Sequence, residues 1–171
     1  MGGFANNAPI VTDGIVFYVD AGNDNSYPGS GTTWSDLIGS DDATLTNGPT
    51  YSSSNGGYID YDGTNDYVVS SGNLPALNSL SALSVCGFFK IDDSSTIADS
   101  SGLTVFIDTT KLTGGSAFSP TDTSNTVYIG SRSTSTNEIM NGSIACLSIY
   151  NKALTDAEVT QNYNALKNRF V

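Results

Sequence analysis

The chain has 171 residues, a length that suits one domain with its own hydrophobic core. Hydrophobic residues make up 38% of it, and Gly, Ser, Thr, Asn and Asp fill most of the rest, which is typical of short strands joined by polar turns. The formal net charge of −11 argues against binding to nucleic acid, and the absence of histidine excludes histidine metal sites and the Ser-His and Cys-His catalytic dyads.

The N-terminal part is expected to form an extended arm over residues 1–12, followed by one domain over residues 13–171. The alternation of Ile15, Phe17 and Val19 predicts a first strand over residues 15–19. Further apolar runs between turn residues predict strands at residues 43–45, 57–61, 67–69, 83–89, 103–107, 126–130 and 144–150. Asp62-Gly63 predicts a hairpin turn after the strand at 57–61. The pattern indicates an all-β, antiparallel sandwich.

The C-terminal segment changes to a helical period and predicts a helix over about residues 156–168. Thr155 and Glu158 have the spacing of a capping box, and Leu154 can close over Val159 as a hydrophobic staple. An apolar stripe is expected to dock the helix on the sandwich and contains Val159, Tyr163, Leu166 and Phe170.

The cysteines Cys86 and Cys146 each lie in an apolar, strand-like run. A bridge between them is one alternative, and two reduced structural thiols are the other. No charged-then-apolar leader follows Met1, so the reduced state is the expectation. No apolar run approaches the roughly 20 residues that span a bilayer, and no membrane contact is expected.

Catalysis by a carboxylate pair is not expected. Glycoside hydrolysis requires two carboxyl groups roughly 5 to 10 Å apart. The only glutamates, Glu138 and Glu158, have no such partner in sequence, and Glu158 serves the helix cap. Asp60 and Asp62 share a strand face, but the turn accounts for Asp62. We therefore expect a protein that is not an enzyme.

Calcium is the alternative to a chain without a cofactor, because it takes oxygen ligands from Asp, Asn and carbonyl groups. One loop over residues 20–25 and a second over residues 60–66 offer such ligands, although neither completes an EF-hand. The candidate ligands of the second loop are Asp60, Asp62, Asn65 and Asp66. Turn and cap roles explain the same residues without an ion.

A carbohydrate site would need an exposed aromatic side chain beside polar groups. Tyr27, Trp34 and Tyr51 lie in loop-like segments and are the candidate ligand-binding residues. A single tryptophan in a small β domain is more often part of the core, so Trp34 has a structural alternative.

Several stretches, taken together, resemble laminin-G-like modules of the concanavalin A-like type. They are residues 13–23, 26–37, 60–68, 127–132 and 141–155, and the modules that they resemble occur in structural proteins of tailed bacteriophages, especially marine phages and cyanophages. The chain departs from the pattern between Phe89 and Thr126, where it is shorter and lacks some middle strands. The resemblance implies a shortened jelly-roll sandwich with a C-terminal helix.

The resemblance further implies a non-enzymatic structural protein of the virion. The expected role is a capsid decoration (cement) protein or a tail-attached component, assembled in the host cytoplasm. Its partners would be the major capsid protein or tail proteins. The alternative is a carbohydrate-binding module or host-surface adhesin that binds surface glycans, because one fold of this type hosts several functions.

Overall fold

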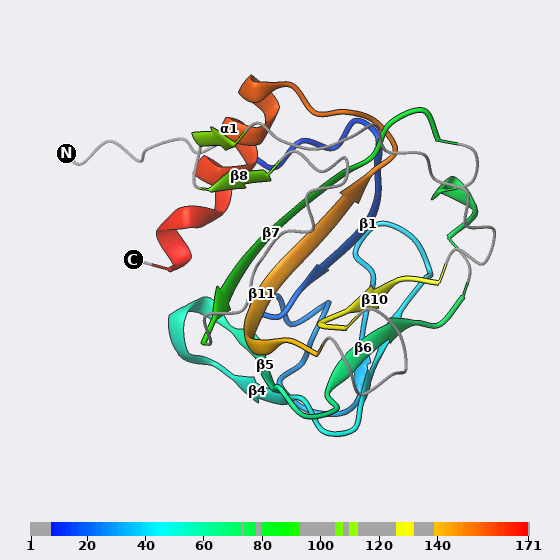
Figure 1. Ribbon diagram of the computed structural model, residues 1–171, viewed down its shortest axis with the longest axis vertical. Helices are drawn as coiled ribbons and strands as arrows, with labels where there is room; N and C mark the ends of the chain where they lie inside the picture. Colours follow the sequence, from blue (N-terminus) through cyan, green and yellow to red (C-terminus); the bar gives the residue numbers. More distant parts are fainter. Residues whose placement is uncertain are drawn as a thin grey trace.

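The computed structural model describes residues 8–72, 74–77, 80–92, 105–107, 110–112, 126–131 and 139–170. Of the predicted arm, only residues 8–12 are among them, so the expectation for the first seven residues lies outside the described part. Eleven strands and one α-helix are described, and they form two main sheets with the helix at one side (Figure 1).

The first sheet, sheet A, is built around the longest strand. It contains β1 (Ile15–Asp20), β4 (Thr50–Ser52), β5 (Tyr58–Asp62), β7 (Ser84–Ile91) and β11 (Asn141–Tyr150). β7 pairs with almost the whole of β11, while β1 and β5 share the other edge of β11 end to end, and β4 pairs with β5. All of these pairs are antiparallel. Because β1, β5 and β7 all pair with β11, sheet A depends on a strand late in the sequence.

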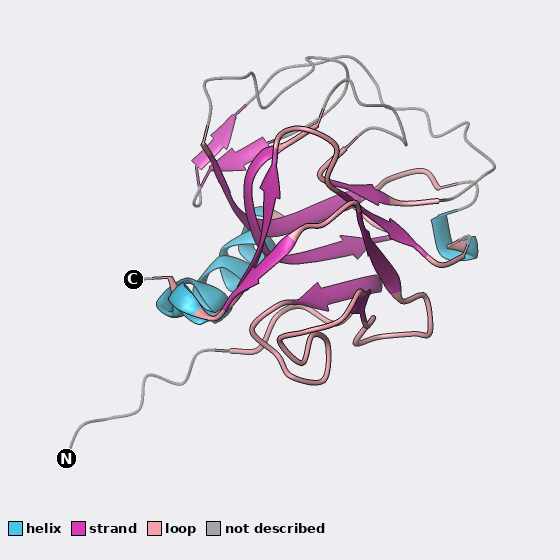
Figure 2. Cartoon of the chain, turned by 90° about the horizontal axis from the view of Figure 1, so that it is seen from below, coloured by secondary structure: helices cyan, strands magenta, loops and turns pink. Residues whose placement is uncertain are grey.

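The second sheet, sheet B, has the order β10-β6-β3-β2. Its strands are β2 (Thr33–Trp34), β3 (Ala43–Thr46), β6 (Tyr67–Ser70) and β10 (Tyr128–Ile129). A separate hairpin joins β8 (Val105–Ile107) and β9 (Thr110–Leu112). Two 3-10 turns lie in connections between strands: Ser54–Gly56 between β4 and β5, and Pro75–Leu77 between β6 and β7. The antiparallel β-sandwich that the sequence predicts is confirmed, and Figure 2 shows its layers.

The core lies between the two sheets. From sheet A, Phe17, Val19 and Ile59 contribute side chains with no exposed surface. Sheet B contributes apolar side chains from each of its four strands, namely Trp34, Ala43, Leu45, Val68 and Ile129. These positions alternate with more exposed ones along their strands, because successive side chains of a strand point to opposite faces.

The predicted hairpin at Asp62-Gly63 is wrong, because β5 belongs to sheet A and β6 to sheet B. The turn passes from one sheet to the other. Asp62 Oδ1 accepts a hydrogen bond from the backbone N–H of Thr64 at 2.8 Å, and Asp66 Oδ2 accepts one from the N–H of Asp62 at 3.1 Å. The Asp-Gly pair therefore forms a tight turn, but long-range pairing with β11 and β3 decides which sheet each strand joins.

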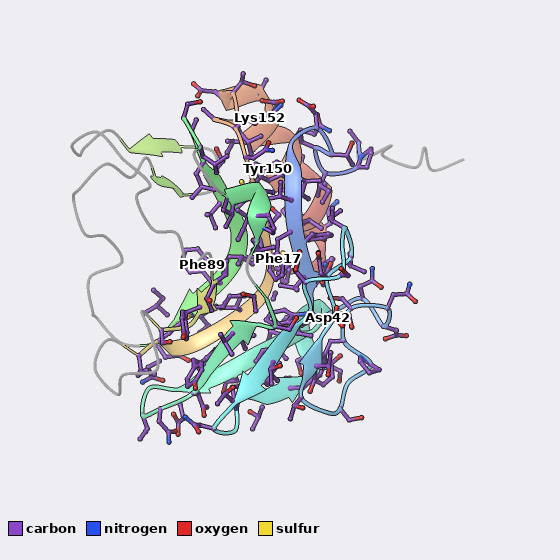
Figure 3. The ribbon with its side chains drawn as sticks, turned by 90° about the vertical axis from the view of Figure 1, so that its right-hand side faces the viewer. Phe17, Asp42, Phe89, Tyr150 and Lys152 are labelled. Atoms are coloured by element: carbon purple, nitrogen blue, oxygen red, sulfur yellow. The ribbon has the colours of Figure 1, made fainter. Side chains whose placement is uncertain are left out.

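The C-terminal helix α1 (Asp156–Leu166) begins where the sequence predicts and continues as a 3-10 turn, η3 (Lys167–Arg169). The capping box is confirmed, since Thr155 and Glu158 each bond the other's backbone N–H. Lys152 lies beside the helix start, as Figure 3 shows, and pairs with Glu158 at 2.7 Å. No helix within the described ranges has the length and apolar character needed to cross a membrane.

Candidate functional site

Two of the three aromatic side chains that were predicted as carbohydrate-binding candidates are buried. Trp34 has no exposed surface and packs in the core, and its Nε1 has no hydrogen-bond partner among the described residues. Tyr27 is 3% exposed and its hydroxyl donates to the carbonyl of Gly31 at 2.7 Å. Tyr51 keeps part of its surface, and its ring centroid lies 5.3 Å from that of Tyr27. Of the three candidates, Tyr51 is the side chain that could stack on a sugar.

The candidate calcium loop holds its acids in separate structural bonds. Asp60 accepts a hydrogen bond from Ser143 Oγ at 2.7 Å, while Asp62 closes the turn described above. Asp66 is buried, and this burial raises the pKa of its carboxyl group. The carbonyl of Asn65 accepts a bond from Asn47 at 2.8 Å. No group of three or more Asp, Glu, His or Cys side chains within the described ranges is arranged to hold a metal ion, and calcium stays a prediction.

The first acidic loop contains a partly buried ion pair that sequence reasoning missed. Arg169 donates from Nη1 to Asp20 Oδ2 at 2.6 Å and from Nη2 to Asp20 Oδ1 at 2.7 Å. The same Nη2 also donates to the carbonyl of Gly56 at 2.7 Å. Tyr18 Oη and the N–H of Gly22 donate to the remaining sides of the Asp20 carboxylate, each at 2.9 Å. Asp20 therefore anchors the C-terminus and is saturated with donors.

The ladder of sheet A assigns every residue to one of two faces, because paired residues point the same way. The core face carries Phe17 and Val19. The opposite face lies under α1, and we call it the helix face. Its members, read from the register, are Tyr18, Asp20, Cys86, Phe88, Cys146, Ser148 and Tyr150. It is aromatic and polar, unlike the aliphatic core face.

Both cysteines belong to the helix face and are free thiols. Cys86 pairs with Ser148 and Cys146 pairs with Phe88, so the two thiols are diagonal neighbours on adjacent strands. Diagonal Cα atoms of an antiparallel pair lie roughly 7 to 8 Å apart, farther than a relaxed disulfide allows. Burial raises the pKa of Cys146 to about 12 and also raises the pKa of Cys86. The geometry favours the reduced state.

One margin of sheet A exposes apolar side chains. Val85 and Phe89 on β7 are 52% and 54% exposed, although the register places them on the core face, opposite Ile149 and Ile144. Figure 3 shows Phe89 at the margin of the sheet, away from Tyr150 and Lys152. Among the described strands, only β11 pairs with β7, so its second edge has no partner there. This margin, defined by Val85 and Phe89, is the β7 margin.

The comparison with family models decides the assignment. A laminin G model described as the concanavalin A-like lectin/glucanases superfamily matches residues 27–160. The chain belongs to this superfamily. The predicted domain type is therefore confirmed, and so is the fold class. Because the superfamily unites lectins with glucanases, membership alone does not distinguish binding from catalysis.

Solved structures also resemble this concanavalin A-like domain. A Trypanosoma rangeli sialidase in complex with sialic acid has a TM-score of 0.58 at 12% identity, covering 95% of this chain and 34% of the sialidase. A mutant of that sialidase displaying trans-sialidase activity has a TM-score of 0.54 at 14% identity, with the same coverage. The domain spans about a third of those chains, and identities this low show the fold alone. The comparison with curated proteins gave no match.

Proposed function

We propose that the chain is a non-enzymatic structural protein of a phage particle, a capsid decoration protein or a tail-attached component, that acts by protein–protein contact. The resemblance of five stretches to modules of tailed-phage structural proteins supports the proposal. The structural observation that supports its non-enzymatic part is that the buried carboxylates Asp20 and Asp36 are engaged in hydrogen bonds of the fold.

The buried acids within the described ranges are committed to the fold. Asp20 is saturated by Arg169, and Asp36 accepts backbone bonds from Tyr18, Ile38 and Gly39 at 2.8 to 3.1 Å. Glu158 serves the helix cap and pairs with Lys152. Glu138 lies outside the described residues. The oxygens of Asp20 and Asp36 are occupied by donors of the fold, so they are not free to contact a substrate, and this arrangement supports contact rather than catalysis.

The β7 margin is the surface that best suits such contact. Exposed apolar side chains on a strand edge favour association with another protein. The strand carries one charged residue, Lys90, which pairs with Asp92, so the margin lacks the acidic character of the whole chain. A capsid or tail protein with an apolar patch would meet little charge repulsion here.

The test uses phage particles prepared without this protein and then mixed with purified chain. Phe89→Ser is expected to lower binding at least tenfold, because the apolar contact is lost. Ile38→Ser is the matched control, since Ile38 is 45% exposed but lies in a loop outside the β7 margin, and it should bind as the wild type does. Particles that bind none of the three proteins would refute the proposal.

The alternative, a carbohydrate-binding module or host-surface adhesin, is favoured by one observation. The ring of Tyr51 is partly exposed, and it packs against the buried ring of Tyr27 and lies beside the turn at Gly29. A glycan array would test it, with Tyr51→Ala expected to abolish any binding. Tyr128→Ala is the matched control, because Tyr128 forms a similar tilted pair with Tyr67 on sheet B. Hydrolysis of a fluorogenic sialoside or a β-glucan would instead indicate an enzyme.

A further inference from the structure

Helix α1 docks on sheet A in an unusual way. An amphipathic helix normally buries an apolar stripe against its sheet. Here the one buried side chain of α1 is Asn162, while Val159 and Leu166 of the predicted stripe are only half-buried. The predicted apolar docking is therefore partly wrong, since the centre of this interface is an amide.

Three anchors hold the segment from Asp156 to Phe170, and Gln161 Nε2 adds a single hydrogen bond to the carbonyl of Pro9 at 2.7 Å. Asn162 accepts a hydrogen bond from the N–H of Val11 at 2.8 Å and donates to Tyr150 Oη at 3.0 Å. Arg169 makes the bidentate bond to Asp20. The third anchor is aromatic, because the rings of Tyr163 and Phe170 stack on that of Phe88, at centroid distances of 6.0 and 4.6 Å.

Two of these anchors are polar, and when they open, water forms hydrogen bonds with the separated groups and offsets part of the loss. The apolar contacts between sheets A and B have no such replacement in water. Segments with few buried apolar contacts open at lower free energy than the core of the same protein. The helix is therefore a segment that can separate while both sheets persist.

We propose that residues 156–170 form a strap that opens as one unit from the helix face of sheet A while the sandwich remains folded. The hinge is the connection after β11, where the N–H of Leu154 bonds Ser84 Oγ at 2.9 Å. Opening uncovers a carboxylate, phenol and hydroxyl surface made of Asp20, Tyr18, Tyr150 and Ser148. The strap is a conformational device independent of the proposed virion role.

The cysteines provide a built-in probe of this opening. Cys146 is 1% exposed and lies beside Asp20 and Arg169, while Cys86 contacts Asn162. Burial raises the pKa of both thiols, so in the closed state they react slowly with maleimide. Labelling of the full chain in native buffer, followed by peptide mass spectrometry, measures each thiol separately.

The expected result is that both thiols label at rates that hardly depend on urea well below the unfolding transition, because a local opening exposes little surface. Arg169→Gln should raise both rates about tenfold or more through loss of the charged, bidentate bonds. Lys90→Gln is the control, since it also removes one positive charge but Lys90 pairs with Asp92, outside the segment, and its rates should stay within about twofold of the wild type.

A labelling rate that rises with urea as steeply as global unfolding does would overturn the proposal. So would an Arg169→Gln effect equal to its loss of global stability, measured in the same preparation. If Arg169→Gln fails to fold, the urea dependence of labelling in the wild type decides the question. Arg169→Lys gives a milder second variant, because it keeps the positive charge but cannot form the bidentate hydrogen bonds to Asp20.

Discussion

Replacing Tyr61 with phenylalanine should stabilise the protein, although the same replacement at Tyr150 should destabilise it. Both tyrosines are buried, with at most 1% of their surface exposed. The hydroxyl of Tyr61 has no hydrogen-bond partner among the described residues, and burial raises the pKa of this phenol. The hydroxyl of Tyr150 donates to the carbonyl of Val11 at 3.1 Å and accepts from Asn162 at 3.0 Å.

The size of each effect follows from these partners. A buried polar group without a partner costs about 1 to 3 kcal/mol, so Tyr61→Phe should raise the free energy of unfolding by about 1 kcal/mol. Tyr150→Phe loses two bonds and leaves the Asn162 amide without one of its partners, which should cost about 2 kcal/mol. The two variants should therefore differ by about 3 kcal/mol, more than a hundredfold in the folding equilibrium constant.

Urea unfolding followed by tryptophan fluorescence measures both variants, because Trp34 is the single tryptophan and is fully buried. The urea dependence should stay the same while the midpoints move in opposite directions. The melting temperature of Tyr61→Phe should rise by about 2 to 4 °C. If Tyr61→Phe is as destabilising as Tyr150→Phe, the Tyr61 hydroxyl has a bonding partner, such as a buried water, and the reasoning fails.

Three further outcomes are expected. Hydrogen bonds from Lys152 and Thr155 lower the pKa of Glu158 from 4.5 to about 2, so its contribution to stability is present above about pH 4.5 and is lost as the pH falls towards 2. Glu158→Gln should therefore weaken the loss of stability between pH 4.5 and pH 2, measured by urea unfolding at each pH. Gly57→Ala should lower the free energy of unfolding by about 3 kcal/mol or more, because a Cβ there would lie 2.7 Å from Gly22 Cα. Gly31 has a similar φ of +94° but open space around it, so Gly31→Ala should lower it by only about 1 to 2 kcal/mol, and equal urea midpoints for the two variants would contradict this reasoning. Alkylation after unfolding without reductant should modify both Cys86 and Cys146, and a protein in which neither reacts would contain the bridge that the register disfavours.

Most core strands could be predicted from the sequence, because alternating apolar residues must bury one face. β1, β3, β5, β6, β7 and β11 all lie where such runs occur. β4 (Thr50–Ser52) could not be predicted in this way, since it is short and two of its three side chains are polar. It exists because its backbone completes the edge of β5. Pairing of this kind depends on a distant partner rather than on local pattern.

The candidate sites were harder to predict, because burial depends on the whole fold. Trp34 and Tyr27 lie in turn-rich sequence, yet the strand and loop that carry them fold against the core. The Asp20–Arg169 pair joins residues from opposite ends of the chain, and no local signal connects them. The helix cap at Thr155 and Glu158 was predictable, because its partners lie three residues apart.

The place of β11 at the centre of sheet A has a consequence for synthesis of the protein. Ile15 pairs with Tyr150, so β1 leaves the ribosome long before its only described partner strand exists. At ordinary translation rates this delay is on the order of ten seconds. During that time the apolar side chains of Val16, Phe17 and Val19 have no sheet to join. Sheet A therefore cannot form until β11 has been synthesised, and until then the nascent chain is a natural client for chaperones that bind exposed strands.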